Sequence, residues 1–464
     1  MTSTAIADFM ASLFTRWPDR VCLLDPGAGV GSLTEAFAER FFAKASRGSI
    51  LEAHAYEIEP VLLHYLVDNL RDIETHAREA GYHFSSTTHE RDFIAEASFA
   101  LGLGGGSRFT HTILNPPYKK INTNSEHRKV LRKAGIETVN LYAAFLALAV
   151  ALTDKNGEIV AIIPRSFCNG TYYRPFRQWL LERVVLTHIH VFESRTKAFK
   201  DDEVLQENII VYMERGGTQG TVMISMSQDQ SFGDYSEREL PFSEIVKNND
   251  PERFIHIPTL QINGSPQLFS HSLEELGLEV STGPVVDFRV KDYWLKEPTN
   301  NCVPLLYAHH FKGDDFNWPK EHKKPNALLL NGETRKWLMP RGYYTITKRF
   351  SAKEEKRRLV AFVVDPGRIP HDLYGFENHL NVFHISKQGL SPDLAHGLAL
   401  FLNSTIVDQY FRSFSGHTQV NATDLRAMRY PSKRDLIRFG KWAKKQKRLS
   451  QEVIDAFIEE HNAE

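Results

Sequence analysis

The sequence predicts an α/β protein with a mostly parallel sheet that ends in an antiparallel edge hairpin, followed by an α+β domain. A strand, a glycine-rich turn and a helix follow one another over residues 21–37, which is the first half of a βαβ unit. Strands then alternate with helices until two strands, near residues 185–192 and 209–213, follow without a clear helix between them. After Asn248-Asn-Asp-Pro251 this rhythm stops.

The length and the charge distribution predict two domains, residues 1–258 and residues 259–464. A chain of 464 residues exceeds what one hydrophobic core usually supports. The net charge, counted as Lys and Arg minus Asp and Glu, is −6 for the first part and +5 for the second. The second part has short strands, frequent turns and basic clusters, so a surface that faces phosphates is expected there. A solvated basic surface without a ligand is the alternative.

Composition predicts a cytoplasmic protein without a bound metal. Hydrophobic residues make up 42% of the chain, and no apolar run is long enough to span a bilayer. The start lacks the pattern of a signal peptide. Cys22, Cys168 and Cys302 lie far apart in the sequence, and the 20 histidines form no HExxH motif. We therefore expect no membrane contact and no metal site.

The glycine-rich turn Pro26–Gly31 follows a strand that ends at Asp25. Together with Asp25 it reads DPGAGVG and has no Lys-Ser/Thr after the last glycine, which argues against a phosphate cradle of the Walker type. Gly27 and Gly29 would let a ligand approach the backbone closely. Dinucleotide oxidoreductases use a similar turn, so the turn alone does not identify the cofactor.

Two acidic residues follow the next two predicted strands. Glu57 ends the second strand, where its carboxylate can accept both hydroxyls of a ribose, and Ile58 can cover an adenine face. Asp92 follows the third strand, where it can accept a hydrogen bond from the amino group of the same adenine, and Phe93 can pack on that ring. The alternative for Glu57 is a solvated strand end.

The segment Thr112-Ile-Leu-Asn-Pro-Pro-Tyr118 combines a buried strand end with a stiff turn. Two prolines fix φ and prevent an immediate helix, so the chain must leave the sheet edge in an extended conformation. The amide oxygen of Asn115 is expected to be free, and the carbonyl of Pro116 is not used in a helix. These two acceptors and the ring of Tyr118 suit a primary amine on a planar ring. A plain Pro-Pro turn with Asn115 as a helix cap is the alternative.

Other segments are expected to surround this turn. Residues 119–135 are polar and basic and predict a mobile loop over the site, and residues 140–152 predict a buried helix. A later strand, Val185 to Phe192, would bring Phe192 to the sheet edge that carries Asn115. Ordinary core packing is the alternative for Phe192.

The order of these motifs resembles that of the DNA adenine-N6 methyltransferases of bacterial restriction–modification systems, in the TaqI-like group and its PstI-like branch. The motifs run in the order Thr2 to Phe14, DPGAGVG, YEIEP, RDF, LNPPY, NLYAAF and HVFES. Three later segments resemble landmarks of the family's specificity domain and extend the resemblance over nearly the whole chain: Val303-Pro-Leu-Leu-Tyr307, Glu377-Asn-His-Leu-Asn381 and Leu402-Asn-Ser404. The cofactor turn precedes LNPPY and the recognition domain comes last, which is the gamma arrangement of the family. The resemblance implies a Rossmann-like methyltransferase domain in residues 1–258 and a DNA-recognition domain in residues 259–464.

By this resemblance, S-adenosylmethionine is the cofactor and each motif takes a role. The residues implied for the cofactor are Thr2 at its methionine end, Asp25, Gly27 and Gly29 along the turn, Glu57 at the ribose, and Ile58, Asp92 and Phe93 at the adenine. The residues implied for the target base are Asn115 and Pro116, which bind its amino group, and Tyr118 and Phe192, which sandwich it. One departure is visible: Ser3 stands where the family usually has a proline after the threonine.

The implied partners are double-stranded DNA and a cognate restriction endonuclease that acts on the same site. A protein glutamine N5-methyltransferase is one alternative, because it uses an NPPY motif on another planar nitrogen. It would not need the basic, turn-rich residues 259–464. A non-catalytic DNA-binding subunit is a second alternative, which is disfavoured by the intact set Asn115, Pro116, Tyr118, Glu57 and Asp92. A dinucleotide oxidoreductase is a third, and the NPPY turn would have no role there.

Overall fold

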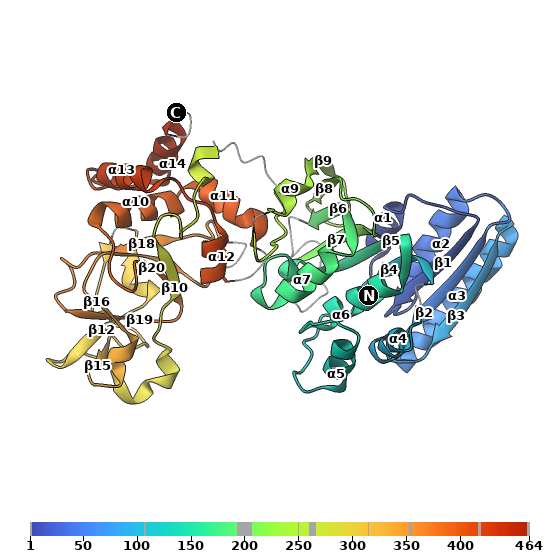
Figure 1. Ribbon diagram of the computed structural model, residues 1–464, viewed down its shortest axis with the longest axis horizontal. Coiled ribbons are helices and arrows are strands. Elements are labelled where there is room, and N and C mark those ends of the chain that lie inside the picture. Colours follow the sequence, from blue (N-terminus) through green and yellow to red (C-terminus); the bar gives the residue numbers. More distant parts are fainter. Residues whose placement is uncertain are drawn as a thin grey trace. The chain divides into compact units, whose positions relative to one another are not determined.

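The computed structural model describes residues 2–105, 108–192, 207–248, 250–258, 266–313, 315–351, 355–415 and 419–461. The chain forms two compact units, Met1–Thr259 and Leu260–Glu464 (Figure 1). The division falls next to the boundary that we expected after residue 258. Within the described ranges no helix combines the length and the apolar character needed to cross a membrane.

A nine-stranded sheet forms the centre of the first unit, in the order β3-β2-β1-β4-β5-β7-β6-β8-β9. Its first five strands are mutually parallel. They are β1 (Arg20–Pro26), β2 (Ile50–Tyr56), β3 (His83–His89), β4 (Phe109–Leu114) and β5 (Thr153–Pro164). The chain moves outward from β1 to β3 and then returns to β4 on the other side of β1. The carboxyl ends of β1 and β4 therefore meet at the switch point where α/β sheets bind ligands.

The predicted hairpin is present, but it is not at the edge of the sheet. Strand β7 (Asn208–Arg215) lies antiparallel between β5 and β6 (Val184–Phe192). Beyond β6 the sheet continues with β8 (Thr221–Ser227), parallel to β6, and with the antiparallel edge strand β9 (Ser236–Pro241). We did not predict these two strands, and β9, with the sequence SERELP, has almost no apolar residue to indicate a strand.

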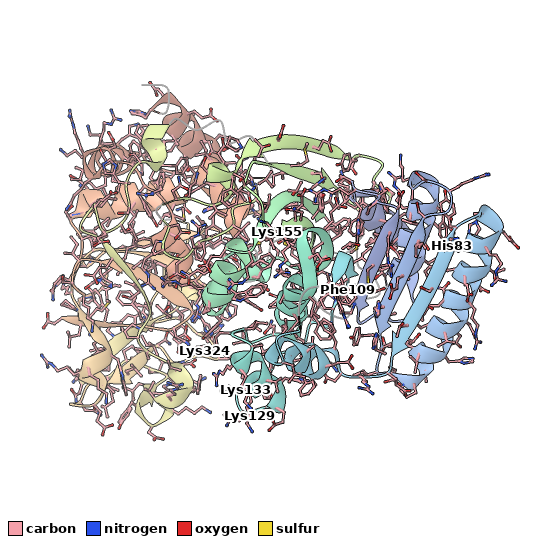
Figure 2. All side chains as sticks on the ribbon, turned by 45° about the vertical axis from the view of Figure 1, so that its right-hand side comes forward. His83, Phe109, Lys129, Lys133, Lys155 and Lys324 are labelled. Carbon is pink, nitrogen blue, oxygen red and sulfur yellow. The ribbon has the colours of Figure 1, made fainter. Side chains whose placement is uncertain are left out.

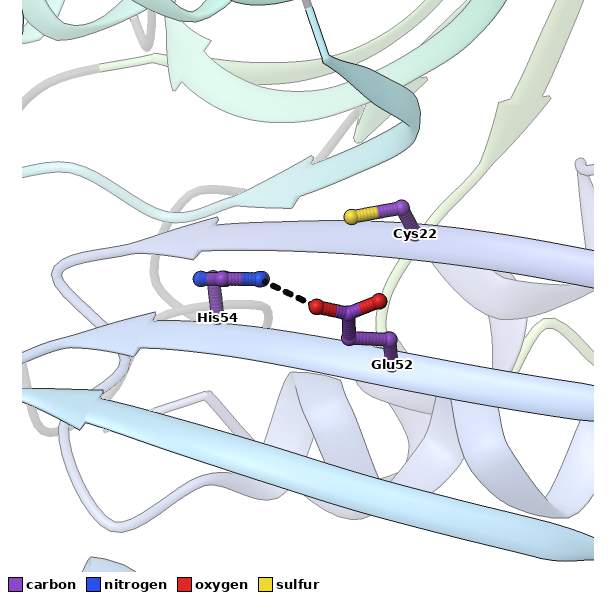
Figure 3. A group of neighbouring side chains, drawn as sticks. All are labelled: Cys22, Glu52 and His54. Carbon is purple, nitrogen blue, oxygen red and sulfur yellow. Dashed lines mark hydrogen bonds and ion pairs between the residues drawn. The ribbon is translucent and has the colours of Figure 1, made fainter.

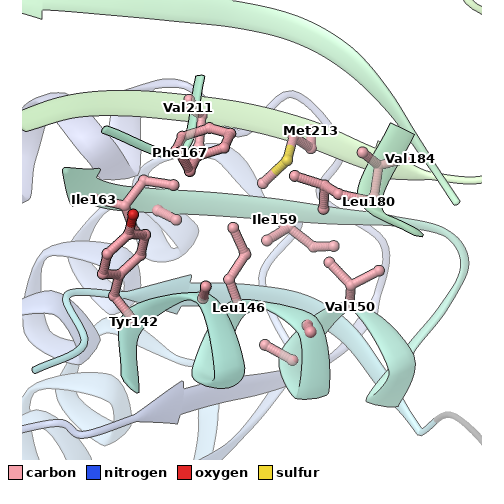
Figure 4. Packing of buried hydrophobic residues seen from close by; sticks show 14 of the residues in the cluster. Tyr142, Leu146, Val150, Ile159, Ile163, Phe167, Leu180, Val184, Val211 and Met213 are labelled. Carbon is pink, nitrogen blue, oxygen red and sulfur yellow. The ribbon is translucent and has the colours of Figure 1, made fainter. Parts of the chain in front are cut away.

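Helices cover both faces of this sheet, and the alternation along β5 divides the core between them. Ile159 and Ile163 face one side, together with α6 (Leu141–Leu152), α4 (Phe93–Gly102) and α7 (Arg174–Leu181) (Figure 4). Val160 and Ile162 face the other side, with α1 (Thr4–Ser12), α2 (Ser32–Lys44) and α3 (Pro60–Ala80). A strand with apolar residues on both faces is typical of a covered parallel sheet.

The prediction of a loop over residues 119–135 is wrong in part, because this segment contains a helix, α5 (Glu126–Lys133). The hydroxyl of Ser125 caps this helix by accepting a hydrogen bond from the backbone N–H of Arg128 at 3.3 Å. Arg128 is buried and forms an ion pair with Glu137. Lys129 and Lys133 lie on its exposed side (Figure 2). The many charged residues of this segment had suggested an unstructured loop.

A buried carboxylate fixes the segment that follows α1. Glu158 of β5 accepts hydrogen bonds from the backbone N–H groups of Thr15 and Arg16, both at 3.1 Å, and pairs with His111 at 3.1 Å. Burial raises the pKa of Glu158, but hydrogen bonds from His111, Thr15 and Tyr212 outweigh this effect and lower the pKa to about 2. The ionised carboxylate thus holds the amino-terminal segment against the sheet.

The second unit combines two antiparallel-rich sheets with helices, which confirms the predicted α+β domain. One sheet has the order β10-β20-β17-β18, with β10 (Glu279–Thr282), β17 (Tyr344–Lys348), β18 (Ala361–Val364) and β20 (Leu380–His384). The other has the order β11-β15-β12-β19-β16, with β11 (Trp294–Leu295), β12 (Cys302–Leu306), β15 (Ala327–Leu329), β16 (Leu338–Pro340) and β19 (Leu373–Phe376). A short pair, β13 (Phe311–Lys312) and β14 (Asp315–Phe316), lies outside both.

Five helices end the second unit, and two of them approach each other through glycine. The helices are α10 (Pro392–Leu402), α11 (Thr405–Phe414), α12 (Ala422–Ala427), α13 (Lys433–Ala443) and α14 (Gln451–Glu460). A Cβ atom at Gly397 of α10 would lie 1.7 Å from the carbonyl oxygen of Leu436 in α13. A Cβ atom at Gly440 of α13 would lie 1.7 Å from the carbonyl oxygen of Asp393. Only glycine permits this backbone contact.

Candidate active site at the carboxyl ends of β1, β2 and β4

The glycine-rich turn wraps closely around the end of β2. The backbone N–H groups of Gly27 and Ala28 donate to the carbonyl oxygen of Tyr56 at 3.0 and 2.8 Å. Gly27 and Gly29 have φ values of 78° and 60°, which side chains rarely adopt. A Cβ atom at Gly29 would meet no atom within 4 Å, so one side of the turn is open to a ligand.

Asp25 lies at the base of this turn with one oxygen unused. The residue is 1% exposed, and its Oδ2 accepts a hydrogen bond from the hydroxyl of Thr34 at 2.7 Å. Its Oδ1 is buried and has no hydrogen-bond partner among the described residues. Burial raises the pKa of Asp25 to about 7; the hydrogen bonds from Thr34 oppose the shift and the charge of Glu57 adds to it. A buried acceptor without a partner is rare, and here it suits a cationic ligand group.

Glu57 ties the turn to the end of β2. Its side chain is nearly buried, and its Oε2 accepts a hydrogen bond from the backbone N–H of Gly29 at 2.9 Å. Its Oε1 accepts two more, from the backbone N–H groups of Ile58 and Glu59, each at 2.8 Å. The carboxylate is therefore oriented by the backbone, and Oε2 keeps a free lone pair. Ile58 is 63% exposed beside it, which is unusual for an isoleucine.

Asp92 and Phe93 begin helix α4. Asp92 caps the helix, since its Oδ1 accepts the backbone N–H of Ala95 at 3.1 Å, and its Oδ2 lies 2.6 Å from Nε2 of His127 in α5. Phe93 is buried against Tyr56, with the ring centroids 5.0 Å apart. The contact with His127 was not predicted, because we expected a loop at that position.

The extended corner after β4 brings Asn115 next to Thr2. Nδ2 of Asn115 donates to the hydroxyl of Thr2 at 3.0 Å, and Oδ1 accepts the phenol hydrogen of Tyr118 at 3.0 Å. We had expected the amide oxygen to be free, but it accepts this hydrogen bond. It keeps a second lone pair. No helix follows Asn115 directly, which removes the alternative of a helix cap. The role of Thr2 in orienting this amide was not visible in the sequence, because 113 residues separate the two.

The other members of the corner, Pro116 and Tyr118, add a backbone acceptor and an aromatic ring. Pro116 is buried, and within the described part of the chain no hydrogen bond reaches its carbonyl oxygen. Tyr118 is half-buried, and its hydroxyl also lies 3.4 Å from the carbonyl oxygen of Ile162. Its ring meets Tyr142 edge-on, with the centroids 6.2 Å apart and an interplanar angle of 87°. The ring and the amide are thus held as one unit.

Phe192 lies at the same edge of the sheet, since β6 and β4 run in the same direction. Its side chain is 2% exposed and packs edge-on against His190, with the ring centroids 4.7 Å apart. It also contacts Phe232. This packing agrees with the alternative of a core residue. The residues that follow, 193–206, lie outside the described ranges, so contact of Phe192 with a base stays a prediction.

Comparisons with known proteins agree with the resemblance found in the sequence. Residues 41–199 match the family model of the Eco57I restriction-modification methylase. The type II methyltransferase M.BsuBI of Bacillus subtilis is 50% identical over 99% of this chain and 92% of its own length. M.PstI of Providencia stuartii, also a type II methyltransferase, is 43% identical over 94% of this chain and 87% of its own.

A solved structure shares the fold. A nuclease-deletion mutant of the type ISP restriction-modification enzyme LlaGI, in complex with a DNA substrate mimic, aligns with 95% of this chain at 12% identity and a TM-score of 0.50. This chain spans 54% of the length of that protein. The family rests on the two sequence relatives, which match nearly the whole chain. The chain therefore belongs to the type II DNA methyltransferases of restriction–modification systems.

Proposed function

We propose that the protein transfers a methyl group from S-adenosylmethionine to N6 of an adenine that has rotated out of double-stranded DNA. The corner formed by Asn115, Pro116 and Tyr118 carries this proposal. It holds two hydrogen-bond acceptors and an aromatic ring at the carboxyl end of β4, beside the open glycine turn of β1. Family membership favours DNA over a glutamine side chain as the substrate.

Three features of the turn fit S-adenosylmethionine. Oδ1 of Asp25 would accept a hydrogen bond from the cofactor's amino group, because this oxygen is buried and has no partner among the described residues. The open side of Gly29 would accept the body of the cofactor. Oε2 of Glu57 keeps a lone pair for a ribose hydroxyl, and the exposed side chain of Ile58 offers an apolar cover for the adenine. Thr2, Gly27, Asp92 and Phe93 complete the set by resemblance.

The acceptors of the corner activate the target amine. The lone pair of the adenine N6 is delocalised into the ring, which makes this nitrogen a poor nucleophile. Oδ1 of Asn115 and the carbonyl oxygen of Pro116 would each accept one N–H, which favours a tetrahedral nitrogen whose lone pair points out of the ring plane. The bound cofactor supplies an electrophilic methyl group on a sulfonium. Thr2 keeps the amide of Asn115 in the required orientation.

Tyr118, with Phe192, would hold the extruded base. Unpairing and unstacking an adenine costs a few kcal/mol, and stacking on an aromatic side chain returns about 1–3 kcal/mol per base. The hydrogen bond between the phenol and Asn115 keeps the Tyr118 ring beside the acceptors. Stacking on Tyr118 and the hydrogen bonds to Asn115 and Pro116 would therefore act on one and the same planar base.

The second unit would bind the DNA backbone through basic surfaces such as that of α13. Lys433, Arg434, Arg438 and Lys441 of this helix are exposed, and the following residues Lys444 and Lys445 are exposed as well. Lysine and arginine contacts to phosphates supply much of the affinity for DNA, and their contribution decreases with salt. A restriction endonuclease acting on the same sequence is the partner that this function implies.

Substitution of Asn115 tests the proposal. Asn115→Ala removes one of the two acceptors, so methyl transfer to duplex DNA is expected to be abolished. Binding of S-adenosylmethionine, measured by calorimetry, is expected to change little, because Asn115 is not among the residues assigned to the cofactor. Glu79→Ala, at an exposed position of α3 in the first unit, serves as a control and should keep both properties. Full methylation by Asn115→Ala would overturn the assignment of the corner.

A further inference from the structure

Three potential metal ligands lie side by side on one face of the first unit. Cys22 of β1 is in register with Glu52 of β2, and His54 follows two residues later on β2. Side chains two residues apart point to the same face of a strand, so all three project from one face of the sheet (Figure 3). A thiol sulfur, a carboxylate oxygen and an imidazole nitrogen lie within 4.8 Å of one another.

This cluster is open to solvent, whereas the same face is buried farther along the strands. Cys22, Glu52 and His54 are each partly exposed, while Leu24 and Tyr56, nearer the carboxyl ends, are buried under the helices of that face. A metal ion and a water molecule can therefore reach the three side chains without local unfolding. The cluster is accessible and still partly shielded from water.

We propose that Cys22, Glu52 and His54 form a zinc-binding site with a water molecule as the fourth ligand. A thiolate, an imidazole and a carboxylate are the ligands that Zn²⁺ prefers, and three protein ligands with one open position are typical of solvent-accessible zinc sites. We expected no metal from the sequence because the first two ligands are thirty positions apart and match no linear motif. Pairing of the two parallel strands brings them together.

Neighbouring groups orient two of the ligands. Nε2 of His54 lies 3.2 Å from Oε1 of Glu52, so a metal ion would take the place of the shared proton. Nδ1 of His54 lies 3.2 Å from Nε2 of His89 on β3, which can accept the remaining ring proton and so fix the tautomer of His54. Arg20 contacts the other carboxylate oxygen, Oε2, at 3.4 Å and leaves Oε1 for the metal.

The backbone that carries the thiol is also fixed. The hydroxyl of Thr110 on β4 accepts the backbone N–H of Cys22 at 3.0 Å and lies 3.2 Å from its carbonyl oxygen. The pairing of β1 with β4 begins at Leu23, one residue after Cys22. The side chain of Thr110 thus joins the two strands at Cys22, before the pairing begins. The ligands therefore sit on strands that are held from both sides.

This site is separate from the proposed methyl-transfer site. Cys22 precedes Asp25 by three residues, which is roughly 10 Å along a strand. A metal ion there would join β1 to β2, the two strands that carry the glycine turn and Glu57. It would stabilise the cofactor-binding part of the sheet without touching the cofactor.

Cobalt binding tests the proposal independently of methylation. Purified protein without an affinity tag is freed of metal with a chelator and titrated with Co²⁺. One equivalent is expected to produce a thiolate-to-cobalt charge-transfer band, and Zn²⁺ should abolish that band by displacing Co²⁺. Cys22→Ser should lose the band, and His54→Ala should weaken binding at least tenfold. Cys302→Ser, in the second unit, is the matched control and should keep the band.

Thermal unfolding gives a second measurement on the same variants. The melting temperature of the wild-type protein should rise with Zn²⁺ concentration, because an ion that binds only the folded state stabilises it. The shift should disappear in Cys22→Ser, whose folding is checked by circular dichroism. Absence of a cobalt–thiolate band in the wild-type protein, or a band that persists in Cys22→Ser, would overturn the proposal.

Discussion

Two substitutions of Tyr118 separate the two roles that we assign to this residue. Tyr118→Phe removes only the hydroxyl that donates to Oδ1 of Asn115 at 3.0 Å. Tyr118→Ala also removes the ring on which the base would stack. The two variants should therefore lose different amounts of activity, and the difference measures the contribution of the ring.

The magnitudes follow from the contacts. One neutral hydrogen bond contributes about 0.5–1.5 kcal/mol, which corresponds to a loss of about 2- to 13-fold in kcat/KM for Tyr118→Phe. Asn115 keeps its hydrogen bond to Thr2 in this variant, so its orientation is weakened but not lost. Loss of stacking costs a further 1–3 kcal/mol, about 5- to 160-fold, in Tyr118→Ala.

Single-turnover methylation of a duplex oligonucleotide measures the rate, and a fluorescent adenine analogue at the target position measures extrusion of the base. Tyr118→Phe should extrude the base normally and methylate it more slowly. Tyr118→Ala should be impaired in both. Equal losses in the two variants would refute the separate role of the ring, and a loss of extrusion in Tyr118→Phe would refute the role of the hydroxyl.

Two further predictions concern the cofactor site and the second unit. Burial places the pKa of Asp25 near 7, above the usual value of 3.8, so the carboxyl is partly protonated at neutral pH and must ionise to pair with the cofactor's amino group. Calorimetry should therefore show affinity for S-adenosylmethionine increasing from about pH 6 to pH 8, more steeply than in Asp25→Asn; identical pH profiles would contradict this role. In the second unit, Gly397→Ala should lower the free energy of unfolding by about 1–3 kcal/mol or more in urea titrations, because the new methyl group overlaps the Leu436 carbonyl. Gly332→Ala, whose Cβ would meet nothing within 4 Å, should change it little, and equal effects of the two would argue against the close contact between α10 and α13.

The sequence predicted the parts of the fold that have strong local signals. Apolar runs bounded by glycine or proline identified β1, β4 and α6, and the two prolines after Asn115 correctly predicted an extended corner. Elements with weak patterns were missed. Helix α5 is rich in charge and begins at a capping serine, and β9 has three consecutive charged residues at the edge of the sheet.

The candidate site shows the same limit. Residue types and their positions after strands indicated Asp25, Glu57 and Asn115, because parallel strands bring their carboxyl ends together. The contacts among side chains could not be predicted, since they join distant parts of the chain. Thr2 orients Asn115, the backbone of Gly29 occupies one oxygen of Glu57, and β-strand register assembles Cys22 with Glu52 and His54.

The chemical identity of the methylated base tests the central claim most directly. Purified protein is incubated with genomic DNA and S-adenosylmethionine that carries an isotopically labelled methyl group, and the DNA is digested to nucleosides for mass spectrometry. We predict that all of the label appears in N6-methyladenine. Label in a methylated cytosine, or no label in DNA under conditions in which the protein binds the cofactor, would contradict the assignment of the Asn115 corner to an adenine amine.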